Sequence, residues 1–342
     1  MATTFKTLNS ANDVTSTRTL LHEAIPLTGT IASGTYTDGN IKTYSHGMFE
    51  SVYDYPYLSS SANHIFDITT GYASNSPLSG ASSNQNSKKL NVYSQMAQVL
   101  VGYDATGSIQ NFDQDGDIAL GGTKINEAIF VNFSRLLTKD EIKKGSFVAS
   151  FLTGGTPAAR TDALTLQDHE GADSYKVNSP AGEYGILYTS SVGITADSGV
   201  GLVYYQAGVA VLTGSIFDGT DMGPGVSSGT YDALATGSNI EVMAESFRNR
   251  LTNISFNNTV ELNSTVYFCR ASHNEFNYSN NPTYLSESQI RVKNSTTDNP
   301  VSYVTTVGLY SSDNELLAVA KLSEPLKKDP NTEVTLRVRL DF

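Results

Sequence analysis

The stretch VTTVGLYSSDNELLAVAKLSEPL, residues 304–326, contains two apolar runs with a polar turn between them. Val304 to Tyr310 alternates threonine with valine, leucine and tyrosine at a period near two, and Glu315 to Leu322 is a second apolar run. Ser311 to Asn314 supplies the small and polar residues that favour tight turns. The stretch therefore predicts a β-hairpin.

A further strand is expected after this hairpin, at residues 333–342 (EVTLRVRLDF). Hydrophobic and polar residues alternate in it, which places the two kinds on opposite faces of a strand. One face carries Val334, Leu336, Val338 and Leu340, and the other carries Thr335, Arg337, Arg339 and Asp341. This pattern is typical of a half-buried antiparallel strand, so we expect the chain to end within a sheet.

The composition indicates a folded, turn-rich chain with many strands. Among 342 residues, 39% are hydrophobic, 28 are glycine and only 16% are charged, whereas disorder requires high charge and few aromatic residues. We expect a mainly β fold with antiparallel β-sandwich or meander sheets and one or two short helices. Three regions are predicted, and we expect them to form one or two compact domains. Residues 1–144 are an N-terminal arm plus an aromatic-rich α+β region, residues 145–238 a Gly-rich β region, and residues 239–342 a C-terminal antiparallel β region.

Two helices are predicted in the first region. Apolar residues recur at helical spacing from Leu90 to Val101, and Gly102 is a plausible stop. A second short helix is expected over residues 137–145, with Thr138 as its N-cap and Glu141 completing a capping box. Residues 127–137 and 239–272 are expected to contain strands.

The charge and the motifs exclude several classes of protein. A net charge of −12 argues against a surface that neutralises phosphates, so no direct nucleic-acid partner and no membrane partner are expected. Residues 1–10 lack the hydrophobic region of a signal peptide, and the chain is interpreted as an intact soluble product. The five histidines show no zinc-ligand spacing, and Cys269 is expected to be a buried strand thiol. Nucleophile-elbow and phosphate-binding motifs are missing, so we expect a non-enzymatic protein with no catalytic residue, metal or cofactor.

Asp113, Asp115 and Asp117 alternate around Gly116 and could present oxygen ligands to calcium. The spacing is not that of an EF-hand, because counting from Asp113 places Ile118 at the sixth position and Lys124 at the twelfth. A solvated acidic turn is therefore the favoured interpretation, and ion binding at residues 113–117 stays open.

Glycoside hydrolysis needs only two carboxylates that the fold brings together, and it leaves no local motif. Four acids are crowded enough to be considered for it: Asp162, Asp168, Glu170 and Asp173. Crowded acids on a loop are usually only solvated, so an enzymatic role is not the favoured interpretation.

The strongest candidates for a functional surface are aromatic residues set among Asn, Ser and Asp. Tyrosine buries a large area at small entropic cost and keeps a hydrogen-bonding tip, so this mixture is common where proteins recognise proteins. The alternative, weighed equally, is that these side chains fill the protein's own core. The candidate interface residues are Tyr53, Tyr55, Tyr57, Phe276, Tyr278, Tyr284, Leu309 and Tyr310.

The closing stretch TTVGLYSSDNELLAVAKLSEPLKK resembles a hairpin of virion proteins from tailed bacteriophages, including tail-collar fibre proteins. Other pieces are similar to structural proteins of T4-like marine phages, and together they span most of the chain; examples are FESVYDYPYLSSSANHIFDITTGY, KKLNVYSQMAQVLVGYDATG and FVNFSRLLTKDEIKKGSF.

The resemblance implies a structural component of the virion, assembled in the host cytoplasm, with other virion proteins as partners and homo-oligomers expected. A tail or baseplate position is favoured over the neck or the capsid. An edge strand in a terminal sheet fits this role, because such edges pair with other chains unless they are blunted. The alternatives are a host-surface carbohydrate-binding module, a capsid decoration protein and a tail-associated glycan hydrolase.

Overall fold

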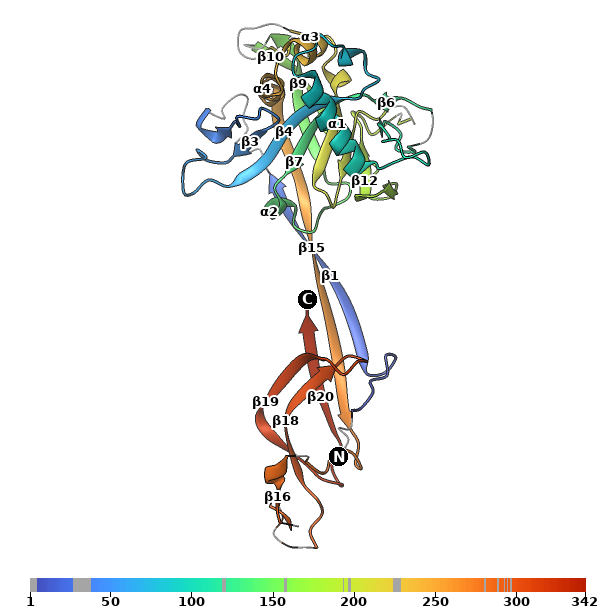
Figure 1. The fold of residues 1–342 in the computed structure, drawn as a ribbon, viewed down its shortest axis with the longest axis vertical. Coiled ribbons are helices and arrows are strands. Elements are labelled where there is room, and N and C mark those ends of the chain that lie inside the picture. Colours follow the sequence, from blue (N-terminus) through green and yellow to red (C-terminus); the bar gives the residue numbers. More distant parts are fainter. Residues whose placement is uncertain are drawn as a thin grey trace. The chain divides into compact units, whose positions relative to one another are not determined.

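The computed structural model describes residues 5–26, 38–118, 121–156, 159–192, 194–195, 198–223, 229–279, 281–287, 289–291, 293, 295 and 297–342. In these residues the chain is mainly β, with antiparallel sheets and four α-helices (Figure 1). The predicted fold class is confirmed, with more helix than the one or two helices expected.

The chain divides into two compact units. The larger unit is Leu21–Val260, and the smaller unit combines Met1–Leu20 with Glu261–Phe342. Both divisions fall inside strands, namely β1 (Val14–Pro26) and β15 (Leu251–Ala271). The predicted regions ended at residues 144 and 238, and neither position separates the two units.

The larger unit is built on an antiparallel sheet that has eight strands among the described residues, in the order β11-β12-β13-β14-β7-β4-β3-β2. Its central strands are β7 (Glu127–Phe133) and β4 (His64–Tyr72). The remaining strands are β2 (Ile41–Lys42), β3 (Glu50–Tyr53), β11 (Lys176–Ser179), β12 (Gly182–Leu187), β13 (Gly201–Tyr204) and β14 (Val209–Thr213).

A second group of strands in the larger unit pairs β9 (Val148–Thr156) with β10 (Ala159–Gln167) and with the first residues of β15. The short strand β8 (Glu141–Ile142) also pairs with β15. The four α-helices are α1 (Asn86–Leu100), α2 (Arg135–Thr138), α3 (Tyr231–Gly237) and α4 (Ile240–Arg250). Single 3-10 turns occupy Asp38–Asn40, Pro77–Ser79, Gly214–Phe217 and Pro282–Tyr284.

Both faces of the eight-stranded sheet are covered, so β7 is apolar on both sides, as expected of a central strand. Ile129, Val131 and Phe133 pack in one hydrophobic cluster with residues of β9, β15 and α4. Phe130, on the opposite face, packs in a second cluster with α1, which lies across the sheet (Figure 1). Gly71 of β4 permits this close packing, because a Cβ there would lie 2.5 Å from the carbonyl oxygen of Lys89 in α1.

The predicted helix at Leu90 to Val101 is confirmed as α1, but the helix predicted to start at Thr138 is wrong. Thr138 is the last residue of α2, and Lys139 has a left-handed φ of 57°, which ends the helix. Glu141 is then the first residue of β8, where tertiary pairing with β15 overrides the local capping pattern. The strand expected from residue 127 ends at Phe133, before α2.

The strands expected from residue 239 begin only at Leu251, because residues 240–250 form α4. Ile240, Met243, Ala244 and Phe247 are buried in it and stand at the i, i+3, i+4, i+7 spacing of an amphipathic helix. That helical spacing is present in the sequence, directly before the strand pattern that begins at Leu251.

In the smaller unit the predicted hairpin is confirmed as β18 (Ser302–Tyr310) and β19 (Leu316–Lys328), drawn in orange and red in Figure 1. The closing strand is confirmed as β20 (Val334–Asp341), which pairs with β15 from Ser264–Asp341 to Ala271–Val334. Its apolar side chains are partly or fully buried and its polar ones exposed, as expected. The other small strands are β16 (Leu285–Ser286) and β17 (Gln289–Ile290). Cys269 lies in β15, opposite Leu336, and is half-buried.

The core of the larger unit contains one poorly satisfied ion pair. Glu50 of β3 is 4% exposed, and its Oε2 lies 3.9 Å from Nε of Arg248 in α4, with neither atom hydrogen-bonded. Burial raises the pKa of Glu50 from 4.5 to about 7, and the Arg248 charge opposes this only in part. The native state therefore holds the Glu50 proton more tightly than the unfolded state does.

The free energy of unfolding is expected to fall as pH rises from about 4.5 to about 7, because over that range the unfolded state loses the Glu50 proton that the native state still binds. The difference in pKa corresponds to about 3 kcal/mol. Glu50→Gln should remove this dependence, so the variant is expected to gain stability over wild type at pH 8 but not at pH 4.5. Urea unfolding at both pH values measures the difference in stability between the variant and wild type. Asp173→Asn, at an exposed residue, is the control. Parallel pH profiles for wild type and Glu50→Gln would contradict it.

Candidate functional site

The smaller unit has almost no hydrophobic core of its own. Among its described residues, Tyr284 and Val338 are the hydrophobic side chains that are buried. Both clusters of buried hydrophobic residues belong entirely to the larger unit. Several apolar side chains of the terminal strands are therefore left at the surface, although those of β20 are partly or fully buried.

The hairpin β18–β19 carries most of these exposed side chains. In the described residues it is a two-stranded sheet, in which β18 pairs only with β19. A two-stranded hairpin is at best marginally stable in water unless a hydrophobic face is covered. We name the following set the hairpin surface: Tyr303, Tyr310, Leu316, Leu317 and Val319, which are 46–68% exposed.

Two members of the candidate interface, Leu309 and Tyr310, lie on this hairpin. Leu309 is half-buried opposite Ala318, whereas Tyr310 is exposed and contacts Phe5 edge-on, with ring centroids 4.9 Å apart. The sequence reasoning missed Leu316, Leu317 and Val319. Their signal was present, because residues 315–322 form an apolar run without a regular polar face.

Three further candidates come from the loop before β18. The ring of Tyr284 is buried, packs edge-on against Tyr278 at 5.1 Å and donates a hydrogen bond to the carbonyl of Val301. Tyr284 therefore serves the packing of its own unit. Tyr278 and Phe276 are 42% and 43% exposed and stay available for contacts.

Tyr53, Tyr55 and Tyr57 belong to the larger unit and so form a separate group. Tyr53 is half-buried between the rings of Tyr57 and His64, at 6.3 and 5.5 Å. Tyr55 is the most exposed of the three, at 57%. The eight predicted residues are thus divided between two units, with only Leu309 and Tyr310 on the hairpin.

The crowded acids at residues 162–173 differ in environment. Asp168 is 2% exposed, and its Oδ2 accepts hydrogen bonds from Tyr205 Oη at 2.7 Å and Gly145 N at 2.8 Å. Burial raises the pKa of Asp168, and these hydrogen bonds lower it. Asp162, Glu170 and Asp173 are exposed. Asp168 therefore ties β10 to neighbouring parts of the larger unit.

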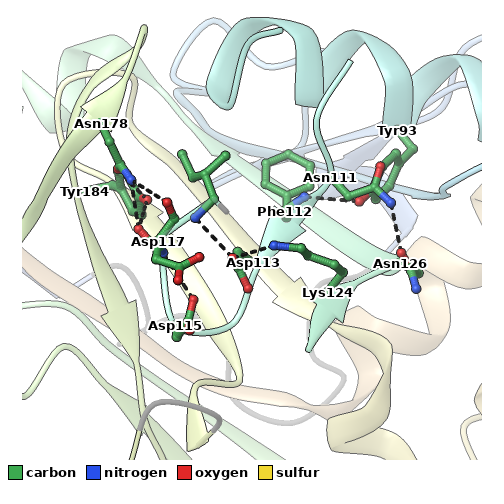
Figure 2. Close-up of polar contacts among 12 residues, drawn as sticks. Tyr93, Asn111, Phe112, Asp113, Asp115, Asp117, Lys124, Asn126, Asn178 and Tyr184 are labelled. Atoms are coloured by element: carbon green, nitrogen blue, oxygen red, sulfur yellow. Dashed lines mark hydrogen bonds and ion pairs between the residues drawn. The ribbon is translucent and has the colours of Figure 1, made fainter. Parts of the chain in front are cut away.

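The acidic turn at residues 113–117 lies in the connection between two short paired strands, β5 (Phe112–Asp113) and β6 (Lys124–Ile125), as Figure 2 shows. Asp113 is 2% exposed, and its Oδ2 accepts from Lys124 Nζ at 2.6 Å and from Ile118 N at 3.1 Å. Burial raises the pKa of Asp113, and the Lys124 ammonium opposes it. The expectation of a solvated turn is therefore wrong for Asp113, although Asp117 is exposed.

Two side chains of the neighbouring strands hold the turn in place. Asn178 Nδ2 donates to the carbonyls of Gly116 and Asp117, at 3.0 and 3.3 Å, and Tyr184 Oη donates to Gly116 at 2.9 Å (Figure 2). The carbonyl of Gly116 is thereby fixed from the side of β11 and β12.

Comparison of the chain with protein-family models, with curated proteins and with solved structures gives no match. Within the described residues, none of the helices combines the length and the apolar character needed to cross a membrane.

Proposed function

We propose that this chain is a non-enzymatic structural component of a tailed-phage virion, in the tail or baseplate, that assembles through protein–protein contacts. Copies of the same chain and neighbouring virion proteins are the proposed partners. One observation carries the proposal: among its described residues the smaller unit buries two hydrophobic side chains, while its hairpin surface stays exposed.

The physical reason is the free energy of apolar burial, about 25 cal/mol for each Å² removed from water. A unit that buries so little apolar surface gains little stability from its own packing. Exposed side chains such as Leu316, Leu317 and Val319 would supply the missing burial at a contact with another chain. Symmetric homo-oligomers provide such contacts, because every copy presents the same surface.

The position in a virion rests on the resemblance of the closing hairpin and of the other quoted pieces to phage structural proteins. The acidic net charge of −12 supports contacts with proteins over contacts with nucleic acid or anionic lipid. The hydrogen bonds of Asp168 with Tyr205 and Gly145 favour a structural role for one of the acids considered for glycan hydrolysis.

Quantitative mass spectrometry of purified particles of the phage that encodes this chain tests the proposal. The chain is expected in a fixed copy number for each particle, at a value compatible with tail or baseplate symmetry. If the chain is present in the infected-cell lysate but completely absent from intact particles, the proposal is wrong.

A further inference from the structure

We propose that the acidic turn is a binding site for a Ca²⁺ ion, with Asp113, Asp115 and Asp117 as its carboxylate ligands. This inference is independent of the virion proposal. It starts from Asp113, whose side chain is 1% exposed and whose Oδ1 has no hydrogen-bond partner. A buried carboxylate oxygen without a partner is costly, and a bound cation or water is one explanation for such an atom in a native protein.

The spacing of the three carboxylates suits one cation. One oxygen from each of Asp113, Asp115 and Asp117 lies within 4.8 Å of the other two. Calcium binds oxygen at 2.3–2.6 Å, so two of its ligands on opposite sides of the ion are at most about 5 Å apart. An ion between the three carboxylates can therefore contact all of them.

The backbone leaves room for the ion. Gly122, at the far side of the loop, has a left-handed φ of 63° and no side chain. A Cβ at this position would lie 3.5 Å from Asp115 Oδ2 and 3.6 Å from Asp113 Oδ1, so these two oxygens border the same space. The unpartnered Oδ1 of Asp113 thus faces the space that it shares with a second carboxylate.

The local charge also favours a divalent cation. The three carboxylates bring three formal negative charges, and the Lys124 ammonium is paired with one of them through Asp113 Oδ2. Two negative charges are left, which a Ca²⁺ ion would neutralise. Carboxylate oxygens are the hard ligands that calcium prefers, and a site without nitrogen or sulfur ligands does not suit zinc or copper.

The ion has a path from solvent. Asp115 and Asp117 border an open hollow of about 350 Å³ that is also lined by Glu170, Lys176 and Tyr188. Water from this hollow can complete the coordination shell, since calcium takes six to eight oxygen ligands and commonly includes water among them. Glu170 and Lys176 bring charges of opposite sign to the lining of this hollow.

Isothermal titration of the EDTA-treated, dialysed full-length protein with CaCl₂ tests the site. One Ca²⁺ per chain is expected to bind, with a Kd in the range of about 10⁻⁶ to 10⁻³ M. Asp115→Asn and Asp117→Asn should each weaken binding by at least roughly tenfold, because each removes a charged ligand without changing the size of the side chain. Asp173→Asn, an exposed acid outside the turn, is the matched control and should leave Kd unchanged.

A second variant keeps the test decisive. Lys124→Met removes the positive charge that competes for Asp113 and is expected to tighten Ca²⁺ binding by at least roughly tenfold. Three results would each overturn the proposal. The first is weaker Ca²⁺ binding by Lys124→Met than by wild type, and the second is equal Kd values for wild type and both Asn variants. The third is no binding by wild type at a Ca²⁺ concentration 10-fold above a Kd of about 10⁻³ M.

Discussion

Replacing Leu317 and Val319 together by lysine is expected to convert the assembled protein into monomers. Both side chains lie near the start of β19, where Leu317 is the extra residue of a β-bulge, and they are 68% and 52% exposed. At a contact with another chain each of these side chains would be buried. Lysine at either position would remove the apolar contact and bury an unpaired charge. We expect self-association to weaken by at least roughly 100-fold, about 3 kcal/mol.

The change should leave the larger unit intact, since its two hydrophobic clusters contain no hairpin residue. Light scattering measures the molar mass, and urea unfolding monitors the larger unit. The matched control replaces Leu58 and Leu136 by lysine, because both are exposed apolar residues of the larger unit, at 86% and 75%. Equal molar masses for the hairpin variant and the control would show that the hairpin surface is not the contact.

Arg250→Met is expected to lower the free energy of unfolding of the larger unit by about 3–5 kcal/mol. Arg250 ends α4, is 1% exposed, and its guanidinium donates to the carbonyls of Leu152, Gly154, Gly155 and Asp221. Methionine fills similar space but donates no hydrogen bond. Four partly buried carbonyls would then lose a charged donor, and a hydrogen bond to a charged group contributes about 1.5–3 kcal/mol.

Arg135→Met is the control for this variant, because Arg135 is exposed and donates one hydrogen bond, to the carbonyl of Gln206 at 2.8 Å. A change within about 0.5 kcal/mol is expected for it. Urea unfolding of the three proteins gives the comparison. A loss below about 1 kcal/mol for Arg250→Met would mean that water replaces the guanidinium at these carbonyls.

Local patterns in the sequence predicted the elements whose periodicity is strong and whose partners are close in the chain. The hairpin at Val304 to Leu326 and helix α1 are examples, since their turn residues and apolar spacing act within a few residues. Helix α4 was missed although Ile240, Met243 and Phe247 carry the helical spacing. The strand pattern of β15, which directly follows α4, was extended back over the residues of the helix.

Non-local pairing could not be predicted in the same way. The division of the chain depends on β15 and β1, which pair across more than 200 positions of sequence, and no periodicity records such a partner. The burial of Asp113 is equally a tertiary property, because it depends on Lys124 and on the packing of β5 and β6. The motif showed which residues could bind an ion, and only the fold shows that one oxygen is buried without a partner.

The molar mass of the full-length protein, measured by light scattering over a wide range of concentrations, tests the central claim most directly. Assembly through the smaller unit predicts a defined multiple of the 36.7 kDa chain that persists on dilution and is lost when Leu317 and Val319 are replaced by lysine. A mass of 36.7 kDa at every concentration, with the smaller unit fully folded, would contradict it.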